Sequence, residues 1–137
     1  MKTTVLTLIF ATLTARPVAA ETYKYAGTLN LVKAQSTGDL SSAPRTLATR
    51  FSVVRAGRGW RFQTSKLNFA CSGDRRDTWT GFQTFYIMLA GVRCTSRYFA
   101  TFQNPKNVSA TLFSNDISCR DGSHAYLSYF GGVKAVR

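Results

Sequence analysis

After its first twenty residues the chain consists of short runs in which apolar and polar side chains alternate. In the run 22–32, the residues Tyr23, Tyr25, Leu29 and Leu31 share one face at a period of two, which is typical of a half-buried strand. Similar or more apolar runs follow at 47–55, 60–71, 78–90, 91–102, 108–114 and 125–133, separated by turn residues. Glutamate occurs only at position 21, so helices held by Glu–Lys pairs are not expected. The pattern predicts an all-β domain, a small antiparallel sandwich or barrel of roughly 6–8 strands.

One stretch also fits a helix. Leu47, Phe51 and Val54 stand at i, i+4 and i+7, the spacing of a helical stripe. This leaves an alternative fold, an α+β domain with one helix near 44–56 on a curved antiparallel sheet. The adjacent valines and the glycine-rich turn at 56–59 favour a strand hairpin instead.

The first twenty residues have the pattern of a signal peptide. Lys2 precedes an apolar stretch at 5–15, and Val18 and Ala20 supply small side chains at the cleavage positions. The apolar stretch is too short for a membrane helix. The sequence therefore predicts a signal peptide over 1–20, a single secreted or periplasmic β-rich domain over 21–137, and no transmembrane segment in that domain.

The chain is strongly basic. Its 18 Lys and Arg residues oppose six Asp and Glu; Lys2 and Arg16 lie in the predicted signal peptide, so 16 against six, a net charge of +10, remain without it. Such a charge attracts anions. Between Asp39 and Asp74 there is no carboxylate, and guanidinium groups bind phosphate or carboxylate oxygens well. The candidate residues for anion or partner binding in this stretch are Arg50, Arg55, Arg58, Arg61 and Lys66.

This composition predicts a small exported binding protein, effector-like or inhibitor-like, that engages an anionic or acidic macromolecule. An acidic protein, a polysaccharide or a nucleic acid fits the charge equally. The competing interpretation is that these cations keep one sheet face hydrated and its edge unattractive to other strands.

Three cysteines follow the signal peptide. If 104–107 is the loop of a hairpin, Tyr98 lies opposite Phe113, and Cys94 and Cys119 share a face two residues out of register. A bulge or a two-residue slip brings them together, so a Cys94–Cys119 disulfide is predicted, with Cys71 as a buried thiol. Pairing of Cys71 with either partner stays open. No C-x-x-C spacing occurs, so neither a metal site nor a cofactor is predicted.

The segment "SCRDGSHAYLSY" (118–129) contains the only histidine. Cys119, Asp121 and His124 lie within six residues, and a Cys–His or Asp–His pair is a candidate for catalysis. A small secreted hydrolase or ribonuclease-like toxin that uses His124 with Asp121 or Arg120 is therefore the alternative function. Such chemistry normally needs two acid–base groups, and a disulfide would consume the thiol. The sequence favours a non-enzymatic protein with no assigned catalytic residue.

Overall fold

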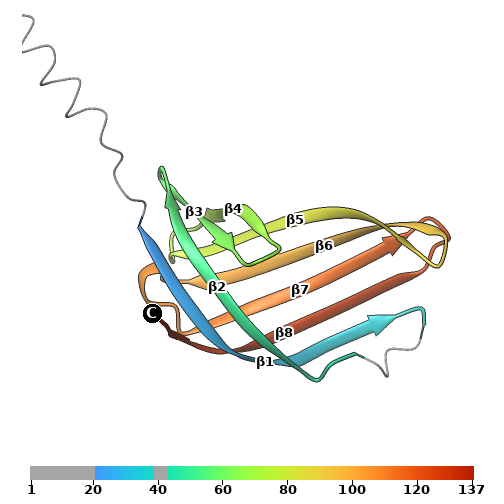
Figure 1. The fold of residues 1–137 in the computed structure, drawn as a ribbon, viewed down its shortest axis with the longest axis horizontal. Helices are drawn as coiled ribbons and strands as arrows, with labels where there is room; N and C mark the ends of the chain where they lie inside the picture. The colour runs from blue at the N-terminus through green and yellow to red at the C-terminus, as the bar shows by residue number, and fades with distance from the viewer. Residues whose placement is uncertain (1–20, 39–42) are drawn as a thin grey trace, which may run out of the picture.

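The computed structural model describes residues 21–38 and 43–137; the predicted signal peptide lies outside this part of the chain. Eight strands dominate it (Figure 1). They are β1 (Thr22–Ser36), β2 (Thr46–Ala56), β3 (Gly59–Gln63), β4 (Asn68–Gly73), β5 (Thr78–Leu89), β6 (Val92–Gln103), β7 (Ala110–Cys119) and β8 (His124–Ala135). A 3₁₀ turn, η1 (Pro105–Asn107), lies between β6 and β7. No helix of the described ranges is long and apolar enough to cross a membrane.

The predicted all-β fold is confirmed, and the alternative with a helix near 44–56 is wrong. That stretch is β2, in which Phe51 and Val53 are buried while Arg50 is exposed. The two-residue period decides the structure because it turns Phe51 and Val53 toward the barrel interior. A helix here would leave one edge of β1 unpaired.

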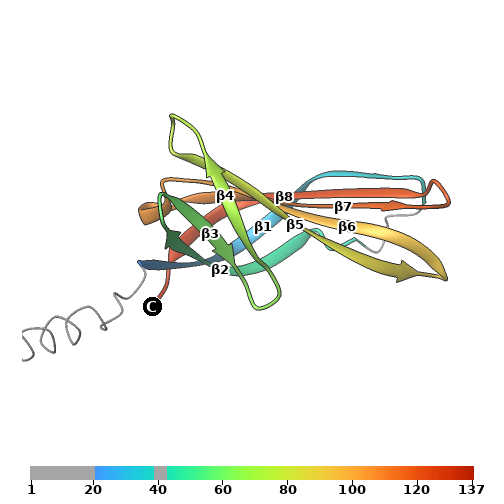
Figure 2. The same cartoon turned by 90° about the horizontal axis from the view of Figure 1, so that it is seen from above.

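The strands form a closed antiparallel barrel in sequence order. Each pairs with its neighbours, and β8 closes the ring against β1 with one irregularity between Leu31 and Lys33. Figure 2 shows the β3–β4 hairpin crossing β7 and β8 steeply, as the strand tilt of a barrel requires. Because the sheet closes on itself, no strand has an unpaired edge in the part of the barrel where all eight strands are present.

Aromatic side chains fill the interior. Phe62 stacks on Phe51 at 4.9 Å and on Phe69 at 5.2 Å between ring centroids. The Tyr25 hydroxyl donates to the Pro105 carbonyl at 2.7 Å, which ties η1 to the interior. The largest fully buried side chains are Tyr25, Phe51, Phe62, Phe102, Leu29 and Val53. Burial of each contributes about 1.5–3 kcal/mol.

The β6–β7 hairpin carries the predicted disulfide but not the predicted register. The loop extends from 104 to 109, because η1 and the two residues after it precede β7. Opposing residues are consequently displaced by two positions, and Tyr98 faces Asn115 instead of Phe113. This displacement puts Cys94 directly opposite Cys119, and the two form a disulfide.

The predicted strand 60–71 is two strands. The chain turns at 64–67, where the Thr64 hydroxyl accepts the N–H groups of Lys66 and Leu67. As a result β3 has five residues and β4 has six, between an 11-residue β2 and a 12-residue β5. The barrel wall is therefore short on this side, and β5–β8 extend well beyond β3 and β4 (Figure 1).

The apolar run 78–90 predicts a strand buried on both faces, but in β5 only Gly81 is buried, and the other residues are half-buried or exposed. On the outer face of β5 the side chains of Phe82, Tyr86 and Met88 are 53%, 85% and 60% exposed. An eight-stranded barrel has one interior, and among residues 21–38 and 43–137 no second layer covers its outer surface. Apolar content alone therefore misled the burial prediction.

Candidate binding site

The short β3–β4 hairpin leaves a gap in the side of the barrel, which we call the lateral gap. The pairing of β2 with β3 covers only 52–56, and the pairing of β4 with β5 covers only 79–81. Residues 46–51 of β2 and 82–89 of β5 thus pair on one side only, with β1 and β6 respectively. The loop 64–67 forms the base of the gap.

A cavity of about 900 Å³ opens at the lateral gap. Its apolar lining comes from both sides and from the wall behind. The larger apolar and aromatic side chains that line it include Leu47, Leu67, Phe85, Ile87, Tyr98 and Phe113. Phe113 also contacts Tyr98 at 5.9 Å and Phe62 at 6.3 Å between centroids. The aromatic rings that line the cavity are therefore continuous with the aromatic core, which holds them in place.

Two cations, Arg50 of β2 and Lys66 of the 64–67 loop, line the same cavity. No aspartate or glutamate lines it. Within the described ranges, the salt bridges are Lys106–Glu21 and His124–Asp116, so neither Arg50 nor Lys66 has a carboxylate partner there. An apolar cavity with unpaired cations at its opening suits a ligand that has both an apolar part and an anionic group.

The structure divides the five predicted anion-binding residues among four places. Arg50 and Lys66 meet at the cavity. Arg55 lies five residues further along β2, about 17 Å at the rise of a strand, where its guanidinium stacks over Trp60 at 5.2 Å. Arg58 is exposed in the β2–β3 turn. The barrel therefore does not bring all five residues together on one surface.

Arg61 has a local partner on the next strand. Its Nε donates to the Asn68 side-chain oxygen at 2.9 Å, and its Nη2 donates to the Asn68 carbonyl at 3.4 Å. It lies on the face of β3 opposite Trp60 and Phe62, which are buried. The alternation along β3 thus separates Arg61 from the cavity.

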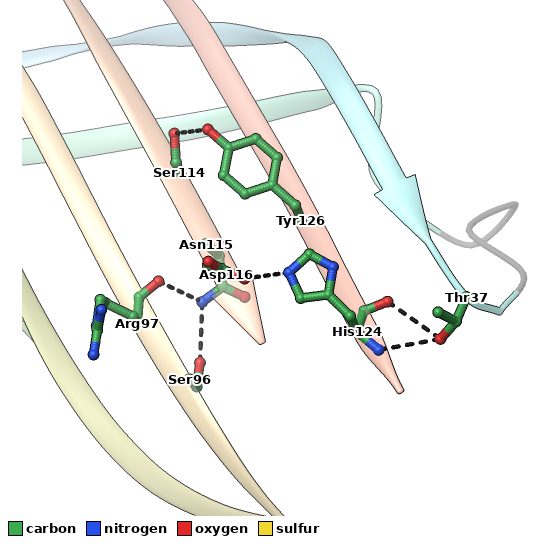
Figure 3. Close-up of polar contacts among 8 residues, drawn as sticks. All are labelled: Thr37, Ser96, Arg97, Ser114, Asn115, Asp116, His124 and Tyr126. Atoms are coloured by element: carbon green, nitrogen blue, oxygen red, sulfur yellow. Dashed lines mark hydrogen bonds and ion pairs between the residues drawn. The ribbon is translucent and has the colours of Figure 1, made fainter. Parts of the chain in front are cut away.

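The 118–129 segment does not assemble the predicted Cys–Asp–His group. His124 Nε2 lies 2.7 Å from a carboxylate oxygen of Asp116 on the neighbouring strand (Figure 3). Asp121 instead accepts hydrogen bonds from the hydroxyl and N–H of Ser123, and these bonds lower its pKa. Cys119 is consumed by the disulfide.

The backbone at His124 is also engaged. Its N–H donates to the Thr37 hydroxyl, and that hydroxyl donates to the His124 carbonyl at 3.4 Å (Figure 3). The same carbonyl also accepts from the Thr37 N–H at 3.0 Å. These bonds join the ends of β1 and β8. Neither His124 nor Asp116 lines the cavity at the lateral gap, and both side chains are partly exposed, at 43% and 37%.

Cys71 is the one free cysteine of the described ranges, and it is buried, as predicted. Burial raises the pKa of its thiol to about 11, so it is protonated and unreactive near neutral pH. Among residues 21–38 and 43–137, no three His, Cys, Asp or Glu side chains come together in a way that could hold a metal ion.

The sequence interpretation missed the apolar lining of the cavity. One signal was present: Thr64, Ser65 and Lys66 form a polar triplet in the middle of the run 60–71. Such a triplet is typical of a turn, and recognising it would have shortened the predicted hairpin. Nothing local, however, indicates that Leu47 and Phe113 face one another across a cavity.

The chain matches no protein-family model, and neither the curated proteins nor the solved structures give a significant match.

Proposed function

We propose that this protein binds an anionic ligand with an apolar part, which enters the barrel through the lateral gap. The observation that carries the proposal is the cavity of about 900 Å³, apolar inside and bordered by Arg50 and Lys66 without a carboxylate. Ligand sites typically enclose about 300–1,000 Å³ and occur at the mouths of barrels. An eight-stranded barrel has room for one small ligand at most.

In this proposal the wall of the cavity contributes apolar contact and its rim contributes electrostatic attraction. Apolar ligand surface removed from water contributes roughly 25 cal/mol per Å², and rings such as Tyr98 and Phe113 provide that contact. Arg50 offers a planar, multiply donating group to an oxyanion, while Lys66 adds a second positive charge on a loop. The two parts together favour an amphipathic anion over a neutral apolar compound.

An exported location is part of the proposal. The Cys94–Cys119 disulfide is compatible with an extracellular site, because disulfides persist in oxidising compartments. Without Lys2 and Arg16 of the predicted signal peptide, Lys and Arg outnumber Asp and Glu by 16 to six, and this excess adds a long-range attraction for anions.

Fluorescence titration with two probes tests the proposal: a fluorescent fatty acid and the alcohol of the same chain. We expect the acid to bind more tightly than the alcohol. The double variant Arg50→Gln/Lys66→Gln should weaken acid binding at least tenfold and alcohol binding much less. A matched control, Arg58→Gln/Lys134→Gln, removes the same charge from exposed positions away from the cavity.

A third variant tests the cavity itself. Thr49 lines it from β2, and Thr49→Trp should block entry of both probes. Equal binding of acid and alcohol, or equal losses in the two double variants, would contradict the proposal.

A second candidate is an anionic macromolecule bound at the outer surface. The favouring observation is that, in the described part of the chain, Arg55, Arg58 and Arg61 have no carboxylate partner. Reversal of all three to glutamate should abolish retention on a heparin column at moderate salt. Retention equal to that of the wild type would eliminate this surface.

The hydrolase alternative stays a prediction, now with Asp116 as the group that contacts His124. Incubation of the purified protein with RNA, beside His124→Ala, is the direct test. Cleavage that His124→Ala abolishes would support an enzyme, and unchanged RNA would exclude a ribonuclease at this position.

A further inference from the structure

Strand β5 presents an unpaired edge along the lateral gap. Its residues 82–89 pair with β6 on one side, whereas the pairing with β4 ends at Gly81. In an antiparallel strand, alternate residues on such an edge direct their N–H and C=O groups outward. The edge therefore offers a row of backbone donors and acceptors to the gap.

The β5 edge lacks the devices that normally prevent strand addition. The segment 78–90 contains no charged residue and no proline, although exposed edges are usually protected by lysine, proline or a bulge. Its outer face is apolar, with Phe82, Tyr86 and Met88 all more than half exposed. A long unprotected edge of this kind is a template for another strand.

The gap has room for an added strand. Elsewhere β3 and β4 occupy the space between β2 and β5, so their absence leaves about three inter-strand spacings, roughly 14 Å. A strand paired with β5 at about 4.8 Å would lie over the cavity and still leave Arg50 of β2 accessible.

We propose that the ligand of the lateral gap is an extended acidic peptide segment of a partner protein, which adds as a strand to residues 82–89 of β5. This inference rests on the proposed function and specifies its ligand. Alternate side chains of the segment point into the cavity, onto Phe85, Ile87 and Tyr98. The intervening side chains point outward, where carboxylates meet Arg50 and Lys66.

Charge complementarity selects an acidic partner over a second copy of this chain. The cavity is bordered by cations and contains no carboxylate, and Lys and Arg outnumber Asp and Glu by 18 to six. Pairing of β5 with the β5 of another copy would be isologous, so it would add like charges to the contact. In a peptide with apolar residues at alternate positions and carboxylates between them, the apolar residues would contact the wall of the cavity and the carboxylates would contact the cations at its rim.

The test uses a fluorescent eight-residue peptide of alternating valine and glutamate, with two N-methylated forms. One form carries N-methyl groups on every valine and the other on every glutamate, so each blocks one backbone edge while the side chains stay the same. We expect one form to bind at least tenfold more weakly than the parent peptide, and the other to bind much as the parent does.

Hydrogen exchange identifies the edge. Amides within 82–89 should gain protection when the parent peptide binds, whereas residues 79–81, already paired on both sides, serve as an internal control. The variant Arg50→Gln/Lys66→Gln should weaken the peptide at least tenfold, and Arg58→Gln/Lys134→Gln should not.

The outcomes separate this inference from the proposed function. If both N-methylated forms bind as the parent does, or if 82–89 gains no protection, strand addition is overturned and recognition of an apolar anion stands. If the fatty acid binds and the peptide does not, strand addition is again overturned. If no probe binds, both proposals fail. A dimer in solution that pairs through β5 would also overturn the proposal that an acidic partner occupies this edge.

Discussion

Removing the disulfide with Cys94→Ala/Cys119→Ala should destabilise the barrel substantially. The bridge joins residues 25 apart in sequence. In the chain-entropy account, closing a loop of that length lowers the entropy of the unfolded chain by about 12 cal/mol/K, which contributes about 3.5 kcal/mol at room temperature. Domains of this size are typically stable by about 5–15 kcal/mol, so the bridge accounts for a large share.

Urea unfolding followed by tryptophan fluorescence measures this effect, because Trp60 and Trp79 belong to the core and its border. With a slope of about 1.5 kcal/mol/M, the midpoint should fall by about 2 M in the double variant. Wild-type protein in reducing agent should show a similar loss, and reducing agent should leave the double variant unchanged.

Cys71→Ala provides the matched control. Cys71 is a free thiol, so this variant should keep the full sensitivity to reduction. If reduction changes the unfolding free energy of the wild type by less than about 1 kcal/mol, the loop-entropy reasoning is refuted, because an intact β6–β7 hairpin would then need no covalent closure.

Three further predictions concern packing and titration. Burial holds the pKa of the Cys71 thiol at about 11 in the folded protein, above its ordinary value of 9.0. Because the folded state holds this proton more tightly than the unfolded chain does, the thiol stabilises the fold fully below pH 9, and this stabilisation disappears as pH rises toward 11. The difference in unfolding free energy between wild type and Cys71→Ala should therefore shrink over that range, and a constant difference would disprove it. Tyr25→Phe removes the hydrogen bond to the Pro105 carbonyl and should cost about 1 kcal/mol or more in urea unfolding; an unchanged midpoint would show that water replaces the hydroxyl. Gly81→Ala puts a methyl group 2.5 Å from a β4 carbonyl oxygen, whereas in Gly132→Ala the methyl group meets nothing nearer than 3.6 Å. We therefore expect Gly81→Ala to lower the free energy of unfolding by about 1–3 kcal/mol more than Gly132→Ala does. Equal thermal midpoints of the two variants would contradict this.

Much of the fold could be predicted from local patterns. The two-residue period along β1 and β2 is a property of neighbouring side chains, so it is readable without knowing the partner strands. The Cys94–Cys119 bridge followed from the shared parity of the two residues on one hairpin. The pairing of the other two cysteines left Cys71 as the free thiol, and its burial followed from the apolar character of an unpaired cysteine.

The candidate site could not be predicted in the same way. Arg50 and Arg55 lie in one basic run, yet the strand separates them and only Arg50 reaches the cavity. The partner of His124 is Asp116, eight residues earlier on a neighbouring strand, instead of the nearer Asp121. Proximity in sequence misled both assignments, because strand pairing brings distant residues together and carries adjacent ones to opposite faces.

The amino-acid sequence alone specifies an antiparallel barrel or sandwich that is basic overall and carries one disulfide across a hairpin. Local side-chain alternation, turn residues and cysteine parity are enough for that. It takes the paired strands to show that β3 and β4 are too short to complete the wall, and that Arg50, Lys66 and an apolar cavity meet at the resulting gap. The physical reason is that the lengths of neighbouring strands and the registers set by their turns are relations between distant segments, which no single segment specifies.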